Sequence, residues 1–136
     1  GSLREQLCYP TEVKKFTDEH LNSVLHEVNL KTLVERYPNL DIKQDWPRIL
    51  SLGEQQRLAF ARLLLNSPRF AVLDEATSAL DIDTEKKLYS LLKERELSLI
   101  SVGHRPSLKD FHENILELNG KGDWKLVTSD RYNFND

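Results

Sequence analysis

The feature that most constrains the fold is a pair of short apolar runs separated by an amphipathic stretch. The first run, RFAVLD, spans residues 69–74, and the second, LSLISVG, spans residues 97–103. Runs of this length are typical of strands buried in a parallel sheet. Between them, residues 84–95 place Leu88, Leu91 and Leu92 on one face of a predicted helix. A strand, a helix and a second strand in this order predict two parallel strands joined by a crossover helix.

Helical spacing dominates the first half of the chain. Leu21, Val24, Leu25 and Val28 follow an i, i+3, i+4, i+7 pattern, which predicts an amphipathic helix. Further elements are predicted as helices over 30–36 and from Ser51 to about residue 66, and as strands over 114–118 and 124–128. Residues 1–16 are expected to be extended or looped. The predicted class is α/β, with a helical part followed by a partial parallel sheet with crossover helices.

The composition narrows the class of protein. The 136 residues carry a net charge of -3 without a stripe of lysine and arginine, which argues against a nucleic-acid partner. Cys8 is the only cysteine, so an internal disulfide or a cysteine-based metal site is excluded. No apolar run approaches the ~20 residues of a membrane-spanning helix, so we expect this segment to be soluble on its own.

The stretch SLGE, residues 51–54, stands where the third predicted helix begins. Ser51 and Glu54 have the spacing of a capping box, in which the serine accepts from the backbone and the glutamate reaches back. The same helix end carries partial positive charge and free N–H groups, and Gly53 would let an anion approach the backbone. Helix capping and phosphate binding both explain these residue types.

Two adjacent carboxylates, Asp74 and Glu75, follow the first predicted strand. Ligands of open α/β sheets bind outside the carboxyl ends of the strands. Two carboxylates at one strand end repel each other unless a cation or hydrogen-bond donors lie nearby. One suits a hydrated Mg²⁺, and the other suits the orienting or deprotonation of an attacking water. The alternative is a turn cap at Asp74 and a solvated Glu75, with Asp81 capping the next helix.

A histidine, His104, follows the second predicted strand in the sequence SVGHR. At this position it can contact a γ-phosphate or hold an attacking water, although a lone histidine is more often structural. Three features follow one another along the chain, separated by amphipathic helices. They are a helix start that can bind phosphate, a strand that ends in Asp-Glu, and a strand followed by His. Together they form a specific arrangement rather than three independent features.

These motifs resemble those of the ATP-binding domain of ABC transporters. LSLGEQQR resembles the family signature LSGGQ, FAVLDEATSALD resembles the Walker B strand, catalytic glutamate and D-loop, and SVGHR resembles the switch-histidine loop. The resemblance covers residues 46–127. The opening GSLREQLCYP also resembles the segment after the Q-loop in one branch of the family. That branch includes bacterial relatives of the peroxisomal fatty-acyl and of the peptide or cobalamin-type transporters.

The resemblance implies a role for the residues at the two strand ends. Asp74 would support Mg²⁺, mainly through water. Glu75 would be the general base or the water-orienting residue, and His104 would contact the γ-phosphate of ATP.

The resemblance also implies a second ATP-binding domain as a partner. Ser51 and Gly53 would contact the γ-phosphate of an ATP held by that domain, and Asp81 would communicate across the dimer interface. Leu52 and Glu54 depart from the glycine and glutamine that are usual in the signature. Glu54 is expected to point away from the phosphates, as the capping box requires.

The phosphate-binding loop of the family has no counterpart among the 136 residues, because no G-x-x-x-x-G-K-[ST] pattern occurs. We therefore expect a C-terminal fragment of an ABC ATPase domain of the P-loop NTPase class. On its own it should bind Mg-ATP weakly or not at all, and it should not hydrolyse it. The missing strand next to that loop would leave unpaired sheet edges, which predicts a non-native oligomer of the isolated chain.

The resemblance divides the chain into four parts: a segment following the Q-loop (1–15), a helical signature subdomain (16–66), the C-terminal part of the RecA-like core (67–128) and a polar tail (129–136). The full-length protein would energise transport at the cytoplasmic face of the plasma or inner membrane, with a transmembrane domain as partner. A lobe of a soluble SMC or repair-type ABC ATPase is the alternative, although no heptad run precedes Ser51. A non-catalytic interaction module is a third reading.

Overall fold

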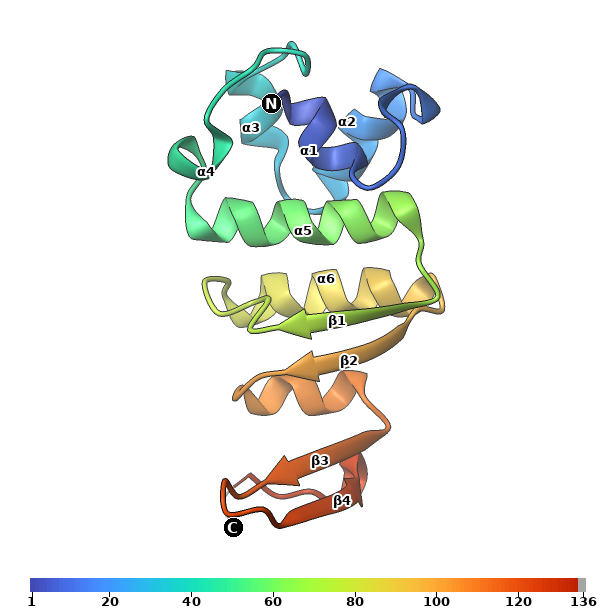
Figure 1. Ribbon diagram of the computed structural model, residues 1–136, viewed down its shortest axis with the longest axis vertical. Coiled ribbons are helices and arrows are strands. Elements are labelled where there is room, and N and C mark those ends of the chain that lie inside the picture. Colours follow the sequence, from blue (N-terminus) through green and yellow to red (C-terminus); the bar gives the residue numbers. More distant parts are fainter. Residues whose placement is uncertain (135–136) are drawn as a thin grey trace.

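The computed structural model describes residues 1–134, and in it a group of helices sits on a small sheet followed by a hairpin (Figure 1). The α-helices are α1 (Leu3–Cys8), α2 (Asp18–Glu27), α3 (Lys31–Arg36), α4 (Trp46–Ile49), α5 (Leu52–Asn66) and α6 (Ile82–Glu94). The strands are β1 (Phe70–Asp74), β2 (Ser98–Val102), β3 (Asn114–Leu118) and β4 (Trp124–Thr128). The short 3₁₀ helices are η1 (Val13–Lys15), η2 (Pro106–Phe111) and η3 (Ser129–Arg131).

Helix α5 is the platform of the helical part, and α1 to α4 lie on one side of it (Figure 1). Its inward residues are buried: Leu58, Phe60, Ala61, Leu64 and Leu65. The helix ends at Ser67, which adopts a left-handed conformation with φ of 41°. Pro68 follows directly and cannot continue a helix, so the chain leaves α5 here and enters β1.

The prediction that residues 1–16 are extended or looped is wrong for their first half. Ser2 caps α1, and its hydroxyl and the Glu5 carboxylate form a reciprocal capping box. Leu3 and Leu7 are fully buried beneath this turn of helix. The segment is too short to show helical periodicity, so its burial against α5 decides a conformation that local pattern does not reveal.

Strands β1 and β2 are parallel, as predicted, with Val72 opposite Ile100 and Asp74 opposite Val102. Helix α6 connects them and covers one face of the pair (Figure 1). Strands β3 and β4 form a separate antiparallel hairpin around the glycine turn. The α/β class with a partial parallel sheet and a crossover helix is therefore confirmed.

Helix α6 ties the helical part to the sheet. Tyr89 of α6 is 1% exposed and packs edge-on against Phe60 of α5, with ring centroids 5.7 Å apart. On its other side Tyr89 stacks on Phe111 of η2 at 5.2 Å. Leu88 and Leu92 of α6 join the same core as the buried side chains of α5. One continuous apolar core thus fixes α5, α6 and η2 relative to one another.

Both strand pairs carry uncovered apolar side chains. On β1 and β2 these residues are Phe70, Val72, Ile100 and Val102, each more than half exposed. On the hairpin they are Leu116, Leu118, Trp124 and Leu126, with Leu116 opposite Leu126. Exposed apolar surface of this extent is a feature of interaction or assembly faces.

The predicted polar tail, residues 129–136, begins with η3, and its last two residues lie outside the described part of the structure.

Among the described residues, no helix combines the length and apolar character that crossing a bilayer requires.

Candidate functional site

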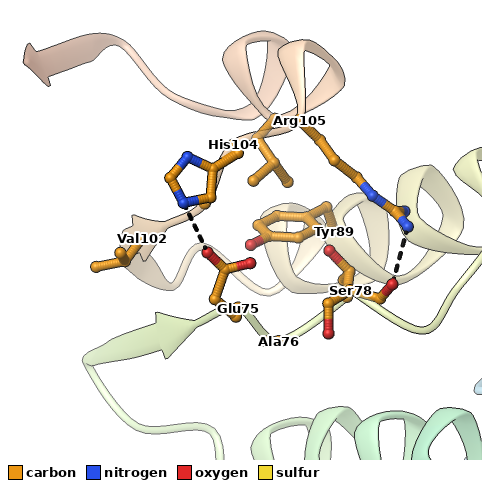
Figure 2. A pocket seen from close by; sticks show the side chains of 10 residues that line it. Glu75, Ala76, Ser78, Tyr89, Val102, His104 and Arg105 are labelled. Carbon is orange, nitrogen blue, oxygen red and sulfur yellow. Dashed lines mark hydrogen bonds and ion pairs between the residues drawn. The ribbon is translucent and has the colours of Figure 1, made fainter.

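The carboxyl ends of β1 and β2 meet at one edge of the sheet, because Asp74 is paired with Val102. The loops that leave this edge carry Glu75 and His104 on the two sides of a pocket of about 230 Å³ (Figure 2). Ser78, Tyr89 and Arg105 contribute to its lining. The structure therefore brings two of the predicted site residues together at the place where α/β proteins bind ligands.

Glu75 and His104 are in direct contact. The Nε2 atom of His104 lies 3.2 Å from Oε1 of Glu75, and the His104 side chain is 91% exposed (Figure 2). Glu75 itself has a φ of 50°, a left-handed conformation that is uncommon for a residue other than glycine. Strain of this kind, of order ~1–3 kcal/mol, clusters at functional sites, and Glu75 differs from Asn29, Ser67 and Glu96, whose positive φ values fall at helix ends.

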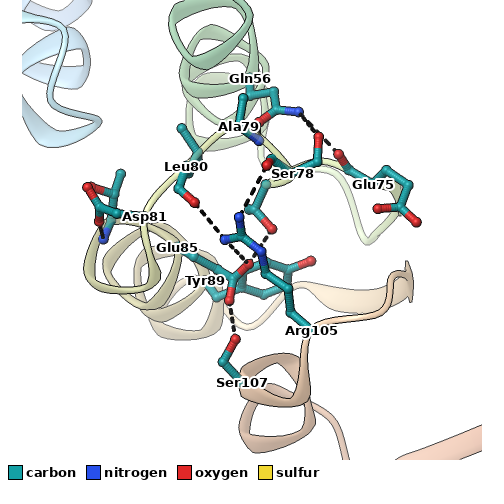
Figure 3. A network of polar contacts seen from close by, with 12 residues as sticks. Gln56, Glu75, Ser78, Ala79, Leu80, Asp81, Glu85, Tyr89, Arg105 and Ser107 are labelled. Atoms are coloured by element: carbon teal, nitrogen blue, oxygen red, sulfur yellow. Dashed lines mark hydrogen bonds and ion pairs between the residues drawn. The ribbon is translucent and has the colours of Figure 1, made fainter.

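The loop after Glu75 is held from two sides (Figure 3). On one side, Gln56 of α5 donates to the carbonyl oxygen of Glu75 at 3.2 Å and to the Ser78 hydroxyl at 2.8 Å. On the other side, Arg105 donates to the carbonyl oxygens of Ser78 at 3.1 Å and Leu80 at 2.6 Å.

A fully buried carboxylate, Glu85 of α6, anchors the second side of this loop. It accepts from the hydroxyls of Thr77 and Ser107 and lies 3.3 Å from Nη1 of Arg105 (Figure 3). Three donors around one carboxylate offset the cost of burying a charge. The network joins the loop after β1, helix α6 and the loop after β2.

The predicted capping box at the start of α5 is present. The backbone N–H of Glu54 donates to the Ser51 hydroxyl at 3.1 Å, and the Ser51 N–H donates to Oε1 of Glu54 at 3.2 Å. The other oxygen of Glu54 pairs with Arg36. Both carboxylate oxygens are thus engaged by this chain, as expected of a side chain that does not face a ligand.

Gly53 lies against the loop that follows β1. A Cβ atom added to Gly53 would stand 3.4 Å from the carbonyl oxygen of Ala79 and 3.6 Å from Cδ2 of Leu80. The glycine therefore lets the start of α5 approach this loop closely. Leu52, which stands where the family signature has glycine, is 58% exposed and leaves the helix end open to solvent.

Asp81 is the N-cap of α6, and its carboxylate accepts from the backbone N–H of Thr84 at 2.7 Å. This hydrogen bond holds the pKa of Asp81 below its ordinary value. Within the part of the chain that the structure describes, Ser51 and Asp81 form no hydrogen bond or ion pair with Glu75 or His104. Ser51 and Asp81 are both exposed, so the roles predicted for them, toward a second ATP-binding domain, remain open to a partner.

Asp74 ends β1 with an exposed side chain directly before Glu75. A single exposed carboxylate fits Mg²⁺, which keeps most of its waters and uses few protein ligands. Within residues 1–134, no three His, Cys, Asp or Glu side chains gather as a ready-made cage for a metal ion. Asp74 could therefore support the ion only together with waters and the phosphates of a substrate.

Sequence reasoning missed Gln56, Glu85 and Arg105 as parts of this site. Glu85 had a usable signal, because it lies one helical turn before Leu88 and Tyr89 on the buried stripe of α6. A charged residue on such a stripe is buried only when it has partners. Gln56 and Arg105 had no such signal, because most of their partners are backbone groups of a loop distant in sequence.

Comparison with known proteins identifies the family. The family model described as ABC transporter matches residues 3–78, which is more than half of the 136 residues. The chain therefore belongs to the ABC transporter family.

Similar proteins extend over most of this chain. An ABC transporter ATP-binding protein of Synechocystis is 49% identical over 93% of this chain. ATP-binding cassette sub-family D member 1 of Drosophila melanogaster is 42% identical over the same share, and the human lysosomal cobalamin transporter ABCD4 is 44% identical. The chain spans about a fifth of the length of these relatives, 18–22%. The predicted branch is confirmed, because sub-family D members, including a cobalamin transporter, are among these relatives.

A solved structure supports the fold. The structure of a bacterial Atm1-family ABC exporter with ATP bound matches 85% of this chain, and 21% of its own chain, with a TM-score of 0.69 and 27% sequence identity. The ABC ATPase fold of the segment is therefore established by both sequence and structure.

Proposed function

We propose that this chain is the C-terminal part of the ATP-binding and hydrolysing domain of an ABC transporter. The observation that carries the proposal is the contact between Glu75 and His104, at 3.2 Å, where the ends of β1 and β2 meet. Asp74 stands beside them on β1. In the full-length protein, ATP hydrolysis by this domain would energise transport at the cytoplasmic face of the membrane, with a transmembrane domain as partner.

Hydrolysis requires a water to be placed and deprotonated next to the γ-phosphate. The half-exposed carboxylate of Glu75 can accept a proton from that water as the water oxygen bonds to phosphorus and the bond to the leaving ADP oxygen breaks. A neutral imidazole has one N–H, so the exposed ring of His104 can orient the Glu75 carboxylate, as in this structure, or donate to a phosphate oxygen once ATP is bound. When bound, Mg²⁺ neutralises phosphate charge, and Asp74 would support it through water.

The start of α5 is proposed to serve an ATP held by a second ATP-binding domain. The first N–H groups of a helix have no carbonyl partner on a preceding turn; the Ser51 hydroxyl accepts from that of Glu54, and Ser51 and Leu52 leave this end exposed. Gly53 lets the same turn pack closely against the loop that follows β1. Asp81, on the loop that packs against Gly53, would report the state of one site to the other.

The test is ATP turnover by the full-length transporter with Glu75→Gln. The substitution keeps the size and a hydrogen-bonding group but removes the base. We expect turnover to fall by about 100-fold or more while ATP binding is retained, since general base catalysis contributes ~10²–10⁴-fold. Unchanged turnover would refute the assignment of Glu75.

The 136-residue chain on its own is proposed to lack ATPase activity and to self-associate. The phosphate-binding loop of the family is absent from these residues, and the apolar side chains of Phe70, Val72, Ile100 and Val102 are uncovered. Light scattering should report more than the 15.8 kDa of one chain, and Val72→Lys should reduce the excess. A monodisperse monomer, or steady turnover by the isolated chain, would contradict this.

Among the alternatives, the names of the similar proteins favour a transporter over a soluble DNA-repair ATPase. The Synechocystis relative is named an ABC transporter ATP-binding protein, the human relative a cobalamin transporter, and the solved structure an ABC exporter. A non-catalytic module is disfavoured because Glu75 and His104 are both present and in contact.

A further inference from the structure

The backbone of Glu75 is fixed at both of its polar groups. Its N–H donates to the carbonyl oxygen of Val102 at 2.9 Å, and its carbonyl oxygen accepts from Gln56 at 3.2 Å. Residue 75 has a left-handed conformation that costs energy, so something must hold it there. The bond to Val102 belongs to the sheet, whereas the bond to Gln56 comes from the helix that begins at Ser51.

Gln56 binds three groups of the same loop. Its Nε2 donates to the Glu75 carbonyl and to the Ser78 hydroxyl, and its Oε1 accepts from the backbone N–H of Ala79 at 2.9 Å (Figure 3). A carbonyl can only accept and an N–H can only donate, so these partners fix which way the amide faces. The side chain therefore spans the loop from its first residue to its fifth.

Arg105 holds the opposite side of this loop and continues directly from His104. Its guanidinium binds the Ser78 and Leu80 carbonyls and rests on the buried Glu85 carboxylate. The loop from Glu75 to Leu80 is thus clamped between α5 and the loop that carries the histidine (Figure 3). A shift of either neighbour would be transmitted to the Glu75 backbone.

We propose that Gln56 is a positioning residue for the hydrolytic reaction, which links the start of α5 to the carboxylate of Glu75. This rests on the proposed function. Gln56 lies one turn of helix beyond the Ser51 cap, so a phosphate bound at that helix end and the base at Glu75 are connected through a single side chain. ATP of the partner domain, bound at the start of α5, would fix the position of this helix. Gln56 would then hold the Glu75 backbone in place for the ATP bound at the ends of β1 and β2.

The neighbouring glutamine provides a matched control. Gln55 also donates twice to backbone oxygens, to Pro47 at 3.1 Å and Leu50 at 3.0 Å, but it does not touch the loop after β1. Gln55→Ala and Gln56→Ala thus remove the same chemical group from adjacent positions of one helix. Only the second releases the carbonyl of Glu75.

The experiment measures steady-state ATP turnover by the full-length transporter with wild-type sequence, Gln56→Ala, Gln56→Glu and Gln55→Ala. Gln56→Glu keeps the size and an acceptor for Ala79 but cannot donate to the Glu75 carbonyl. We expect both Gln56 variants to lower kcat about tenfold or more with KM for ATP within about threefold, because misplacement by about 1 Å costs ~10²-fold. Gln55→Ala should stay within about threefold of wild type in both parameters.

The proposal is overturned if Gln56→Ala behaves like Gln55→Ala, if Gln56→Glu keeps the wild-type kcat, or if the loss appears in KM alone. Thermal unfolding of the four proteins separates positioning from loss of folding, and the Gln56→Glu protein should unfold within a few degrees of Gln55→Ala. The Glu75→Gln variant is included as a reference. If the wild type does not hydrolyse ATP, or Glu75→Gln does not abolish turnover, the proposed function fails rather than the role of Gln56.

Discussion

The left-handed backbone of Glu75 predicts that glycine is more favourable than alanine at this position. Both Glu75→Ala and Glu75→Gly lose the contact with His104, so that loss cancels when the two are compared. A φ of 50° costs a residue with a Cβ about 1–2 kcal/mol, and glycine costs nothing there. Glycine also gains about 0.4–1 kcal/mol of entropy in the unfolded chain, which opposes its advantage. At the middle of the two ranges, the strain less the entropy favours the glycine variant by about 0.8 kcal/mol.

The assay is urea unfolding of the two variants of the 136-residue chain, followed by circular dichroism at matched protein concentration. The glycine variant should have the higher midpoint, and its thermal midpoint should be higher by roughly 2–4 °C. Matched concentration is needed because self-association would stabilise both variants. Equal midpoints, or a more stable alanine variant, would refute the claim that residue 75 is held in a strained conformation.

Three further outcomes follow from single side chains. Glu85→Ala should destabilise the fold by about 3–5 kcal/mol in urea unfolding, because it leaves Arg105 without its buried partner, and Glu85→Gln should cost less. The pKa of Asp81 lies below its ordinary 3.8, so the ionised cap stabilises the fold above pH 3.8 and this is lost as the pH falls through the lowered pKa. Wild type should therefore exceed Asp81→Asn in urea midpoint near neutral pH and lose that advantage in acid, whereas a constant difference would contradict the ionised cap. Burial raises the pKa of the Cys8 thiol, so a thiol reagent should modify it only as the chain unfolds, and fast reaction of the native protein would contradict its burial.

Local chemistry explains which parts of the fold were predictable. The capping box at Ser51 and the helix cap at Asp81 are determined by side chains within three residues, and both are present. The parallel pair of β1 and β2 followed from two apolar runs and the helix between them. The positions of Glu75 and His104 at strand ends followed as well, whereas their direct contact is visible only in the structure.

The remainder depends on contacts between distant segments. Helix α1 forms because Leu3 and Leu7 are buried. Six residues are too few for a periodic pattern to predict this burial. Gln56 and Arg105 bind carbonyl oxygens of the loop after β1, and backbone acceptors are the same in every sequence. Their importance becomes visible only when the loop is seen between α5 and the loop after β2 (Figure 3).

The most direct test of the composite site is complementation between two disabled full-length proteins. Ser51→Arg should block the helix end, and Glu75→Gln should remove the base, so each variant alone is inactive. Mixed dimers, purified with two different tags, combine the intact Glu75 of one chain with the intact Ser51 of the other. If the start of α5 serves the partner's ATP, these mixed dimers recover measurable single-turnover hydrolysis. If Ser51 and Glu75 of one chain serve the same ATP, both sites of the mixed dimer are broken and no activity returns.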